Sequence, residues 1–153
     1  MRHALLFIFI FTASQLSFAG EQFVKNGYAV SGYDTVAYFT VGKPVPGDKN
    51  IQAEWNNAKW LFSSEEHKQL FLANPEKYAP AYDGHCAYAV GAKNYKASTI
   101  PQAWDIVDGK LYLNYSKGVR KSWNKKQAEY IENGDKNWIK LESKPAAGGG
   151  WFG

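Results

Sequence analysis

An Asp-Gly pair, Asp108-Gly109, constrains the fold of this chain more than any other local feature. It separates two short segments, 104–107 and 110–115, that are rich in aliphatic and aromatic residues. Asp-Gly favours the type I′ turn, whose twist matches the twist of two antiparallel strands. The sequence therefore predicts a β-hairpin over 104–115, with its register set by this turn.

A second hairpin is predicted over 51–62, where apolar residues spaced by twos flank the polar pair Asn56-Asn57. Upstream, Asp34 is a natural N-cap ahead of a short apolar stretch, and this predicts a short helix or turn over 32–39. Both segments are too short to bury a core alone, so we expect them to pack against helices.

Helices are predicted on both sides of Pro75. Ser63 and Glu66 have the spacing of a capping box, which predicts a helix that opens there and is interrupted by Pro75. Small and aromatic residues over 82–90 recur at helical spacing, and Asp83 is placed to cap a short buried helix there.

The C-terminal segment 117–142 spaces its apolar residues by three to five, which predicts one or two amphipathic helices broken near Gly134. A Gly-rich tail over 145–153 is expected to be disordered. The predicted fold class is thus α+β: a small antiparallel sheet or hairpins, packed with short helices and a C-terminal amphipathic helix.

The first residues, 1–19, have the pattern of a signal peptide. A basic start is followed by an apolar run over 4–13, which is too short to span a membrane, and Ser17 and Ala19 supply small side chains for a peptidase. We therefore expect cleavage before Gly20 and a periplasmic or secreted protein with no stable membrane insertion. The remaining 20–144 are expected to form a single domain.

Composition excludes several classes of function. The formal net charge of +4 is too small to indicate nucleic-acid binding. A single cysteine excludes an intramolecular disulfide and a multi-cysteine metal cluster. The sequence has no glycine-rich phosphate loop and no Gly-x-Ser-x-Gly elbow, and an exported protein meets no nucleotide pool.

The segment 60–78, WLFSSEEHKQLFLANPEKY, resembles the core of the YHS domain, which reads aromatic-x-Phe, a helix, then Phe-x-x-Asn-Pro-x-x-Tyr. The segments 32–39, 82–87 and 104–115 are similar to the exported single-domain branch of that family. The resemblance implies heavy-metal handling, through a branch with Phe-Cys-Ser-x-x-Cys where this chain has 62–67. Ser63 and His67 stand at the two cysteine positions.

Four residues are candidate ligands for a Cu or Zn ion. Imidazole and thiolate are suitable donors for either metal, and carboxylate or water can complete the site. Neighbouring helical residues point about 100° apart, so we expect His67 to pair with only one of His85 and Cys86. The candidate metal ligands are His67, His85, Cys86 and Asp34. The alternative interpretation is structural: His67 half-buried, Cys86 packed inertly and Asp34 acting as a cap.

An aromatic pocket for a small ligand is the second hypothesis, with Tyr33, Trp60, Tyr82 and Trp104 as its candidate lining. A protein-interaction module is the third. We do not expect an enzyme, because thiol chemistry at Cys86 would also need an oxyanion site and a cleft. The sequence thus predicts an exported binding protein for a metal ion, or alternatively for a small ligand or a protein partner.

Overall fold

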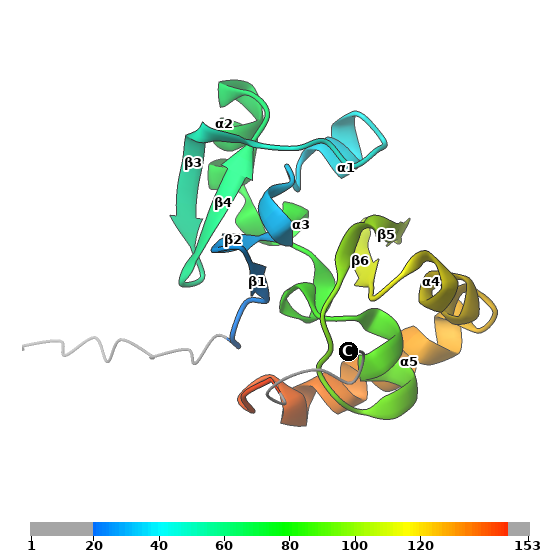
Figure 1. The fold of residues 1–153 in the computed structure, drawn as a ribbon. Coiled ribbons are helices and arrows are strands. Elements are labelled where there is room, and N and C mark those ends of the chain that lie inside the picture. Colours follow the sequence, from blue (N-terminus) through cyan, green and yellow to red (C-terminus); the bar gives the residue numbers. More distant parts are fainter. Residues whose placement is uncertain (1–19, 147–153) are drawn as a thin grey trace, which may run out of the picture.

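The computed structural model describes residues 20–146 (Figure 1). The predicted signal peptide and residues 147–153 of the predicted tail lie outside the described residues. In chain order the elements are β1 (Val24–Lys25), β2 (Tyr28–Ala29), η1 (Val30–Gly32), α1 (Ala37–Thr40), β3 (Asp48–Trp55), β4 (Ala58–Phe62), α2 (Glu65–Ala73), α3 (Pro75–Tyr78), η2 (Ala81–Gly84), η3 (Ala89–Lys93), β5 (Ile100–Val107), β6 (Lys110–Asn114), α4 (Lys117–Asn124) and α5 (Gln127–Leu141). The fold is α+β, as predicted: within the described residues, antiparallel two-stranded sheets pack against short helices.

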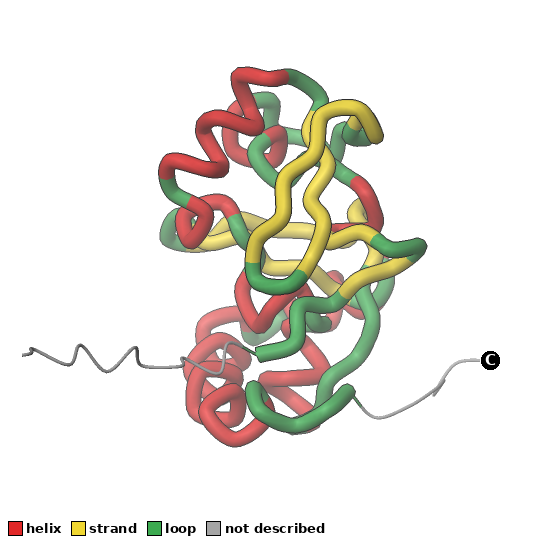
Figure 2. Tube along the Cα trace, turned by 90° about the vertical axis from the view of Figure 1, so that its left-hand side faces the viewer, coloured by secondary structure: helices red, strands yellow, loops and turns green. Residues whose placement is uncertain are grey.

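Strand β6 separates two hydrophobic cores. Leu111 and Leu113 lie in the first core, with Trp60, Phe62 and other residues from the N-terminal half. Tyr112, between them, lies in the second core, with residues of η2, α4 and α5. Successive side chains of a strand point to opposite faces, so one short strand serves both cores. Figure 1 shows β3, β4 and α2 on one side of β6 and α4 and α5 on the other, and Figure 2 shows the strands gathered together in yellow.

Both predicted hairpins are confirmed. β3 pairs antiparallel with β4 through Asn56 and Asn57, which have φ of 50° and 56°. β5 pairs antiparallel with β6 through Asp108 and Gly109, with φ of 49° and 76°. Positive φ at both central residues is what a type I′ turn requires, and Asn, Asp and Gly tolerate it best.

The predicted helix before Pro75 is confirmed as α2, but its cap lies one residue later than expected. The Ser64 hydroxyl, rather than that of Ser63, accepts a hydrogen bond from the His67 N–H at 3.1 Å. The hydroxyl of Ser63 is bound elsewhere, to Asp34. Pro75 begins α3, whose first turn is capped by Asn74.

The prediction of one helix over 82–90, capped by Asp83, was wrong for its first half and its cap, because helical backbone begins only at Ala87. Tyr82 and Asp83 have left-handed backbone, with φ of 55° and 50°, inside the short 3₁₀ element η2. The π-helix η3 follows only at Ala89–Lys93. The turn directs the ring of Tyr82 into the second core, where it lies 5.9 Å from Tyr112 and 5.7 Å from Trp138 between ring centroids.

The predicted break near Gly134 was also wrong, because the chain breaks between α4 and α5, at residues 125–126. Gly134 lies inside α5, and a Cβ added there would lie 2.4 Å from the Tyr82 hydroxyl oxygen. Glycine at this position therefore allows close packing of α5 against η2 and does not end a helix.

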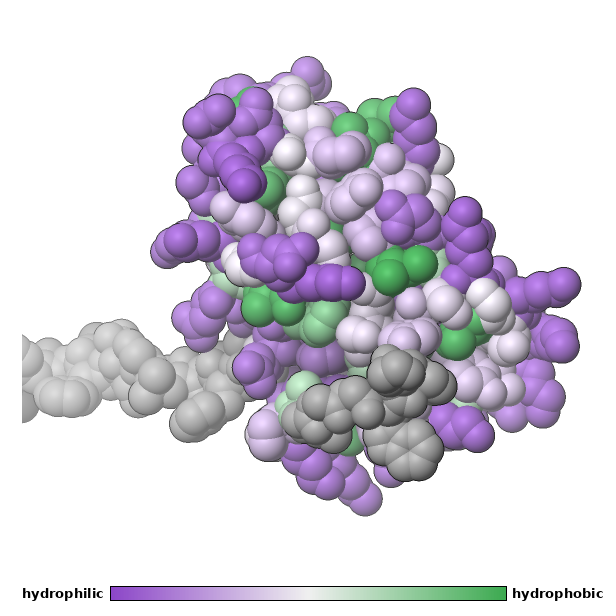
Figure 3. Space-filling view, viewed as in Figure 1, coloured by the Kyte–Doolittle hydropathy of each residue, from purple (hydrophilic) through white to green (hydrophobic). Residues whose placement is uncertain are grey.

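Two further features concern the described residues as a whole. Among residues 20–146, every helix is too short or too polar to cross a membrane. On the face shown in Figure 3, hydrophobic residues form small, separate patches within a mostly hydrophilic surface.

Candidate functional site

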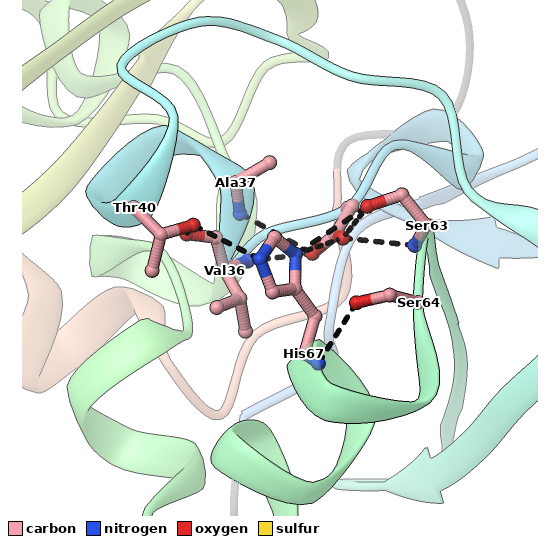
Figure 4. Close-up of polar contacts among 7 residues, drawn as sticks. Val36, Ala37, Thr40, Ser63, Ser64 and His67 are labelled. Carbon is pink, nitrogen blue, oxygen red and sulfur yellow. Dashed lines mark hydrogen bonds and ion pairs between the residues drawn. The ribbon is translucent and has the colours of Figure 1, made fainter.

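The carboxylate of Asp34 is the centre of a polar cluster that joins α1, the end of β4 and the start of α2 (Figure 4). Its side chain is fully buried. The donors to Oδ1 are the backbone N–H groups of Val36 at 2.9 Å and Ala37 at 3.3 Å, and the donors to Oδ2 are the Ser63 N–H at 2.8 Å, the Ser63 hydroxyl at 2.5 Å and His67 Nδ1 at 2.6 Å. These donors occupy the acceptor positions of both oxygens, as burial of a carboxylate requires.

Local structure explains how the three side chains meet. Asp34 precedes α1 and binds the free N–H groups at its start, which is the capping role predicted from the sequence. Ser63 lies just before Ser64, the N-cap of α2, and His67 lies in the first turn of this helix, so both side chains reach Asp34 Oδ2. The two positions that carry cysteine in the metal-handling branch of the resembled family therefore converge on one carboxylate oxygen.

His67 is held at both ring nitrogens. Nδ1 donates to Asp34, and Nε2 lies 3.1 Å from the Thr40 hydroxyl oxygen, while 14% of the side chain remains exposed. A carboxylate acceptor at Nδ1 fixes the tautomer and the orientation of the ring. The cluster thus presents one oriented imidazole near the surface.

The order carboxylate, imidazole, hydroxyl also occurs where a hydroxyl is activated as a nucleophile. Acyl transfer needs, in addition, N–H groups free to bind an oxyanion. The N–H groups of Thr40, Val41 and Gly42 instead donate to the carbonyls of Val36 and Ala37, at 2.8 to 3.1 Å. The N–H groups at the end of α1 are therefore not free to bind an oxyanion, and the contact with Thr40 holds the imidazole in place.

His85 lies elsewhere, in a buried position. Its Nε2 lies 3.2 Å from the Glu21 carbonyl oxygen, and its ring packs against Phe23 and Trp138 at centroid distances of 5.6 and 5.9 Å. Burial lowers the pKa of this imidazole, which favours its neutral form. His85 is therefore enclosed by protein and does not reach the Asp34 cluster.

Cys86 is also buried. Its sulfur accepts a hydrogen bond from the Tyr115 N–H at 3.3 Å and donates to the Asn114 side-chain oxygen at 3.6 Å. Burial raises the pKa of the thiol, so it stays protonated at neutral pH, whereas metal binding and nucleophilic attack both need the thiolate. The structure thus gives Cys86 the environment of a packed residue.

The four predicted metal ligands are not assembled into one centre. Within residues 20–146, the structure contains no group of three or more His, Cys, Asp and Glu side chains placed to hold a metal ion. In the Asp34 cluster, Nδ1 and Oδ2 are 2.6 Å apart, whereas two ligands of a tetrahedral zinc ion lie about 3.3 Å apart. The described residues do not fit a resident metal ion, because the nitrogen and oxygen atoms that could bind the ion are hydrogen-bonded to each other.

The four predicted pocket residues are likewise separated. Trp60 lies in the first core and Trp104 packs edge-on against Tyr38. The Tyr33 hydroxyl accepts a hydrogen bond from Gln102. Tyr82 lines a cleft to which the other three do not contribute, so the predicted pocket is not formed by these four side chains together.

That cleft, of about 340 Å³, lies where the two cores meet. Its size is within the range of small-ligand sites, about 300–1,000 Å³. Its aromatic lining is Trp55, Tyr82, Tyr112 and Trp138, and its charged lining is Glu76, Asp83, Asp135 and Lys110. Three carboxylates thus share the cleft with a single ammonium group.

Hydrogen bonding orders the polar side of the cleft. The Tyr82 hydroxyl donates to Asp135 at 3.0 Å, and burial together with Asp135 raises the pKa of this phenol well above its ordinary value. Burial also raises the pKa of Tyr112. Both phenols therefore keep their protons at neutral pH and act as hydrogen-bonding groups in an aromatic wall.

The sequence identified Tyr82 but missed Trp55, Trp138 and Asp135 as cleft residues. Alternation along β6 was the available signal for Tyr112, since its neighbours Leu111 and Leu113 had to face the opposite core. No local signal places Trp55, from the first hairpin, opposite Trp138, from the last helix.

Comparison with known proteins returned no relative. No family model matches the chain, and the searches of curated proteins and of solved structures found no match. The resemblance to YHS domains therefore rests on the motif residues quoted above.

Proposed function

We propose that the chain is an exported binding protein of the YHS type, and that its cleft takes a small organic cation with an aromatic or apolar body. The observation that carries this proposal is the lining of the cleft, in which four aromatic side chains accompany three carboxylates and one ammonium group. Aromatic faces and carboxylates both attract cations, whereas carboxylates repel an anion.

The single cation of the lining is already engaged. Lys110 Nζ lies 3.4 Å from the Glu76 carbonyl oxygen, so its charge is directed toward backbone. On the opposite side, Asp135 accepts the Tyr82 hydroxyl with one oxygen, at the solvent-exposed surface of α5. A ligand cation at this end would contact carboxylate and ring together, while its apolar part would lie along Trp138 and Tyr112.

Binding of aromatic probes tests this proposal. The probes are benzyltrimethylammonium and phenethylamine, with phenethyl alcohol and phenylacetate as the neutral and anionic analogues. We expect both cations to bind one to one and to quench tryptophan fluorescence, with affinity at least tenfold above that of the analogues. Equal affinity for all four probes, or no binding of either cation at 10 mM, would contradict the proposal.

Two substitutions on α5 locate the binding. Asp135→Asn keeps an acceptor for Tyr82 but removes the charge, and we expect it to weaken cation binding by about tenfold, or about 1.4 kcal/mol. Glu129→Gln is the matched control, since Glu129 lies on the same helix, pairs with Lys126 and does not line the cleft. An equal loss in both variants would indicate a general charge effect instead of a cleft contact.

Capture of a Cu or Zn ion at His67 is the second candidate function. The supporting observation is the hydrogen bond from Nδ1 to Asp34, which is the arrangement that commonly orients a metal-ligating imidazole. Nε2 is directed away from the carboxylate and contacts the Thr40 hydroxyl at 3.1 Å. An ion that replaces this contact would take one ligand from His67, and its other positions would be filled by solvent or by a partner. This arrangement suits transfer of a metal ion better than its storage.

Titration with Zn²⁺, followed by the imidazole NMR signals, tests this second candidate. We expect the signals of His67 to shift and those of the buried His85 to stay, and the response to vanish in His67→Gln but persist in Cys86→Ser. A response that persists in His67→Gln, or no response of wild type at millimolar Zn²⁺, would overturn it.

A further inference from the structure

Gly20 is buried against two acidic residues. A Cβ added to Gly20 would lie 2.2 Å from Asp83 Oδ2, 2.7 Å from Glu142 Cγ and 3.1 Å from the Glu142 carbonyl oxygen. Real Cβ atoms do not approach other atoms so closely, so the space at this position is shaped for a residue without a side chain. In Figure 1 the blue start of the ribbon lies near the orange-red end of α5, in agreement with the approach of Gly20 to Glu142.

The segment that follows Gly20 is fixed onto η2. The Phe23 N–H and the Gln22 side-chain amide both donate to the Asp83 carbonyl oxygen at 2.8 Å, and the Glu21 carbonyl oxygen lies 3.2 Å from His85 Nε2. These contacts hold Gly20 in place beside the Asp83 side chain. The place of Gly20 beside Asp83 is therefore set by its neighbours in the chain.

One oxygen of the Asp83 carboxylate lacks a donor. Its Oδ2 is buried and has no hydrogen-bond partner among the described residues. Burial, and then the charge of Glu142, raise the pKa of this carboxyl, while Lys96 and Lys110 oppose the change. Lys96 Nζ is itself occupied by the carbonyl oxygens of Glu142 and Lys144, at 3.1 and 2.6 Å. A buried carboxylate oxygen without a donor is costly, so a positive donor at this point would stabilise the fold.

We propose that Gly20 is the first residue of the mature protein and that its α-ammonium group is the missing partner of Asp83. The close approach of the added Cβ places the Gly20 nitrogen within about 5 Å of Oδ2, given standard bond lengths. A short rotation about the Cα–C bond of a free terminus closes that distance. The inference rests on the proposed export, since a peptidase must first remove residues 1–19.

The chemistry of the step is peptide hydrolysis. Water adds to the Ala19 carbonyl, the bond from that carbon to the Gly20 nitrogen breaks, and Ala19 leaves as a carboxylate. The released amine of Gly20 takes up protons from water and is charged at neutral pH, since α-amino groups have a pKa of about 7.7–8.0. One neutral amide N–H is thereby exchanged for an ammonium with three donors.

Removal of the leader would therefore stabilise the folded domain. Pairing with a carboxylate raises the pKa of the amine in the folded state. With Asp83 ionised, the added stability is complete below about pH 7.7, where the amine of the unfolded chain is also charged. It is lost as the pH rises through the pKa of the amine in the folded state. The charged groups facing Asp83 are Glu142, Lys96, Lys110 and, through Lys96, Glu21.

The first measurement is the intact mass of the protein exported from its full-length gene. We expect a chain that begins at Gly20. A mature chain that begins at any other residue would overturn the inference, but it would leave ligand binding by the cleft, measured on the same sample, intact.

The second measurement compares unfolding equilibria of two forms, one beginning at Gly20 and one with Gly-Ser-Gly-Ser placed before it. We expect an unfolding equilibrium constant about tenfold smaller for the form beginning at Gly20 at pH 7, which corresponds to about one unit of amine pKa. In Asp83→Asn the two forms should be equally stable, whereas Asp135→Asn, the matched control, should preserve the difference. A difference that persists in Asp83→Asn, or equal stability of the two wild-type forms, would overturn the inference.

Discussion

At the scale of single residues, Asp34 does more than any other side chain to join the N-terminal elements. One fully buried carboxylate receives hydrogen bonds from α1, from the end of β4 and from α2. His67, the nearest approach to a conventional site residue, owes its orientation to this carboxylate. The cluster is therefore first a structural junction, and only its outer imidazole edge is available for binding.

Asp34→Asn should destabilise the fold by about 3 kcal/mol. The amide has the same shape as the carboxylate. Its NH₂ group would, however, face groups that donate hydrogen bonds to the carboxylate, so at least one of these buried donors would lose its acceptor. Urea unfolding at pH 7 measures the change. Ser63→Ala removes only one of the donors and should cost about 1 kcal/mol. Equal losses of stability in the two variants would contradict the conclusion that Asp34 joins these elements through several hydrogen bonds.

At the scale of elements, the contact between η2 and α5 decides the shape of the cleft. The left-handed turn at Tyr82 and Asp83 inserts a ring where Gly134 leaves room on α5. The same ring lines the cleft and donates to Asp135. Packing of two elements and the polar lining of the site thus depend on one side chain.

Gly134→Ala should therefore destabilise the protein, although alanine is favoured over glycine within a helix by about 1 kcal/mol. The added methyl group would lie 2.4 Å from the Tyr82 hydroxyl oxygen, so the ring must move and cation binding by the cleft should weaken. Thermal unfolding and probe titration measure both effects.

Gly118→Ala in α4 is the matched control. The nearest atom to its new methyl group is the Ser116 hydroxyl oxygen at 3.8 Å, so only helix propensity changes, and we expect stabilisation by up to about 1 kcal/mol. If Gly134→Ala also stabilised the protein, the Tyr82 ring would be able to move away from the added methyl group without a loss of stability.

At the scale of the whole molecule, two cores share one short strand, and the buried His85 lies beside the second core, against Trp138. Burial lowers the pKa of His85 from 6.5, so the unfolded chain binds a proton that the folded chain resists. Acidification therefore destabilises the packing around this ring, which contacts Phe23 and Trp138.

Stability should accordingly be complete above about pH 6.5 and should fall as pH decreases through the lowered pKa of His85. The slope from this one group is at most about 1.4 kcal/mol per pH unit. Urea unfolding at pH 7, 6 and 5 measures it, and His85→Gln should show a smaller decrease over the same interval. An equal decrease in both proteins would assign the acid sensitivity to other groups.

The sequence by itself determined the features that depend on neighbouring residues. Asn56-Asn57 and Asp108-Gly109 set their turns by backbone preference, Asp34 bound the N–H groups two and three residues ahead, and Pro75 limited α2. Each depends on contacts within a few positions, where steric and hydrogen-bonding rules act directly.

Only the tertiary structure decided which distant side chains meet. His67 and Asp34 are 33 positions apart in the chain and Tyr82 and Asp135 are 53 apart, and in both pairs packing against other elements brings the partners together. Composition could not show that His85 and Cys86 would be enclosed separately, or that the aromatic cleft would draw on the first hairpin and the last helix. The physical reason is that burial of apolar surface is not directional, so it selects the partners of a side chain only when the whole chain packs.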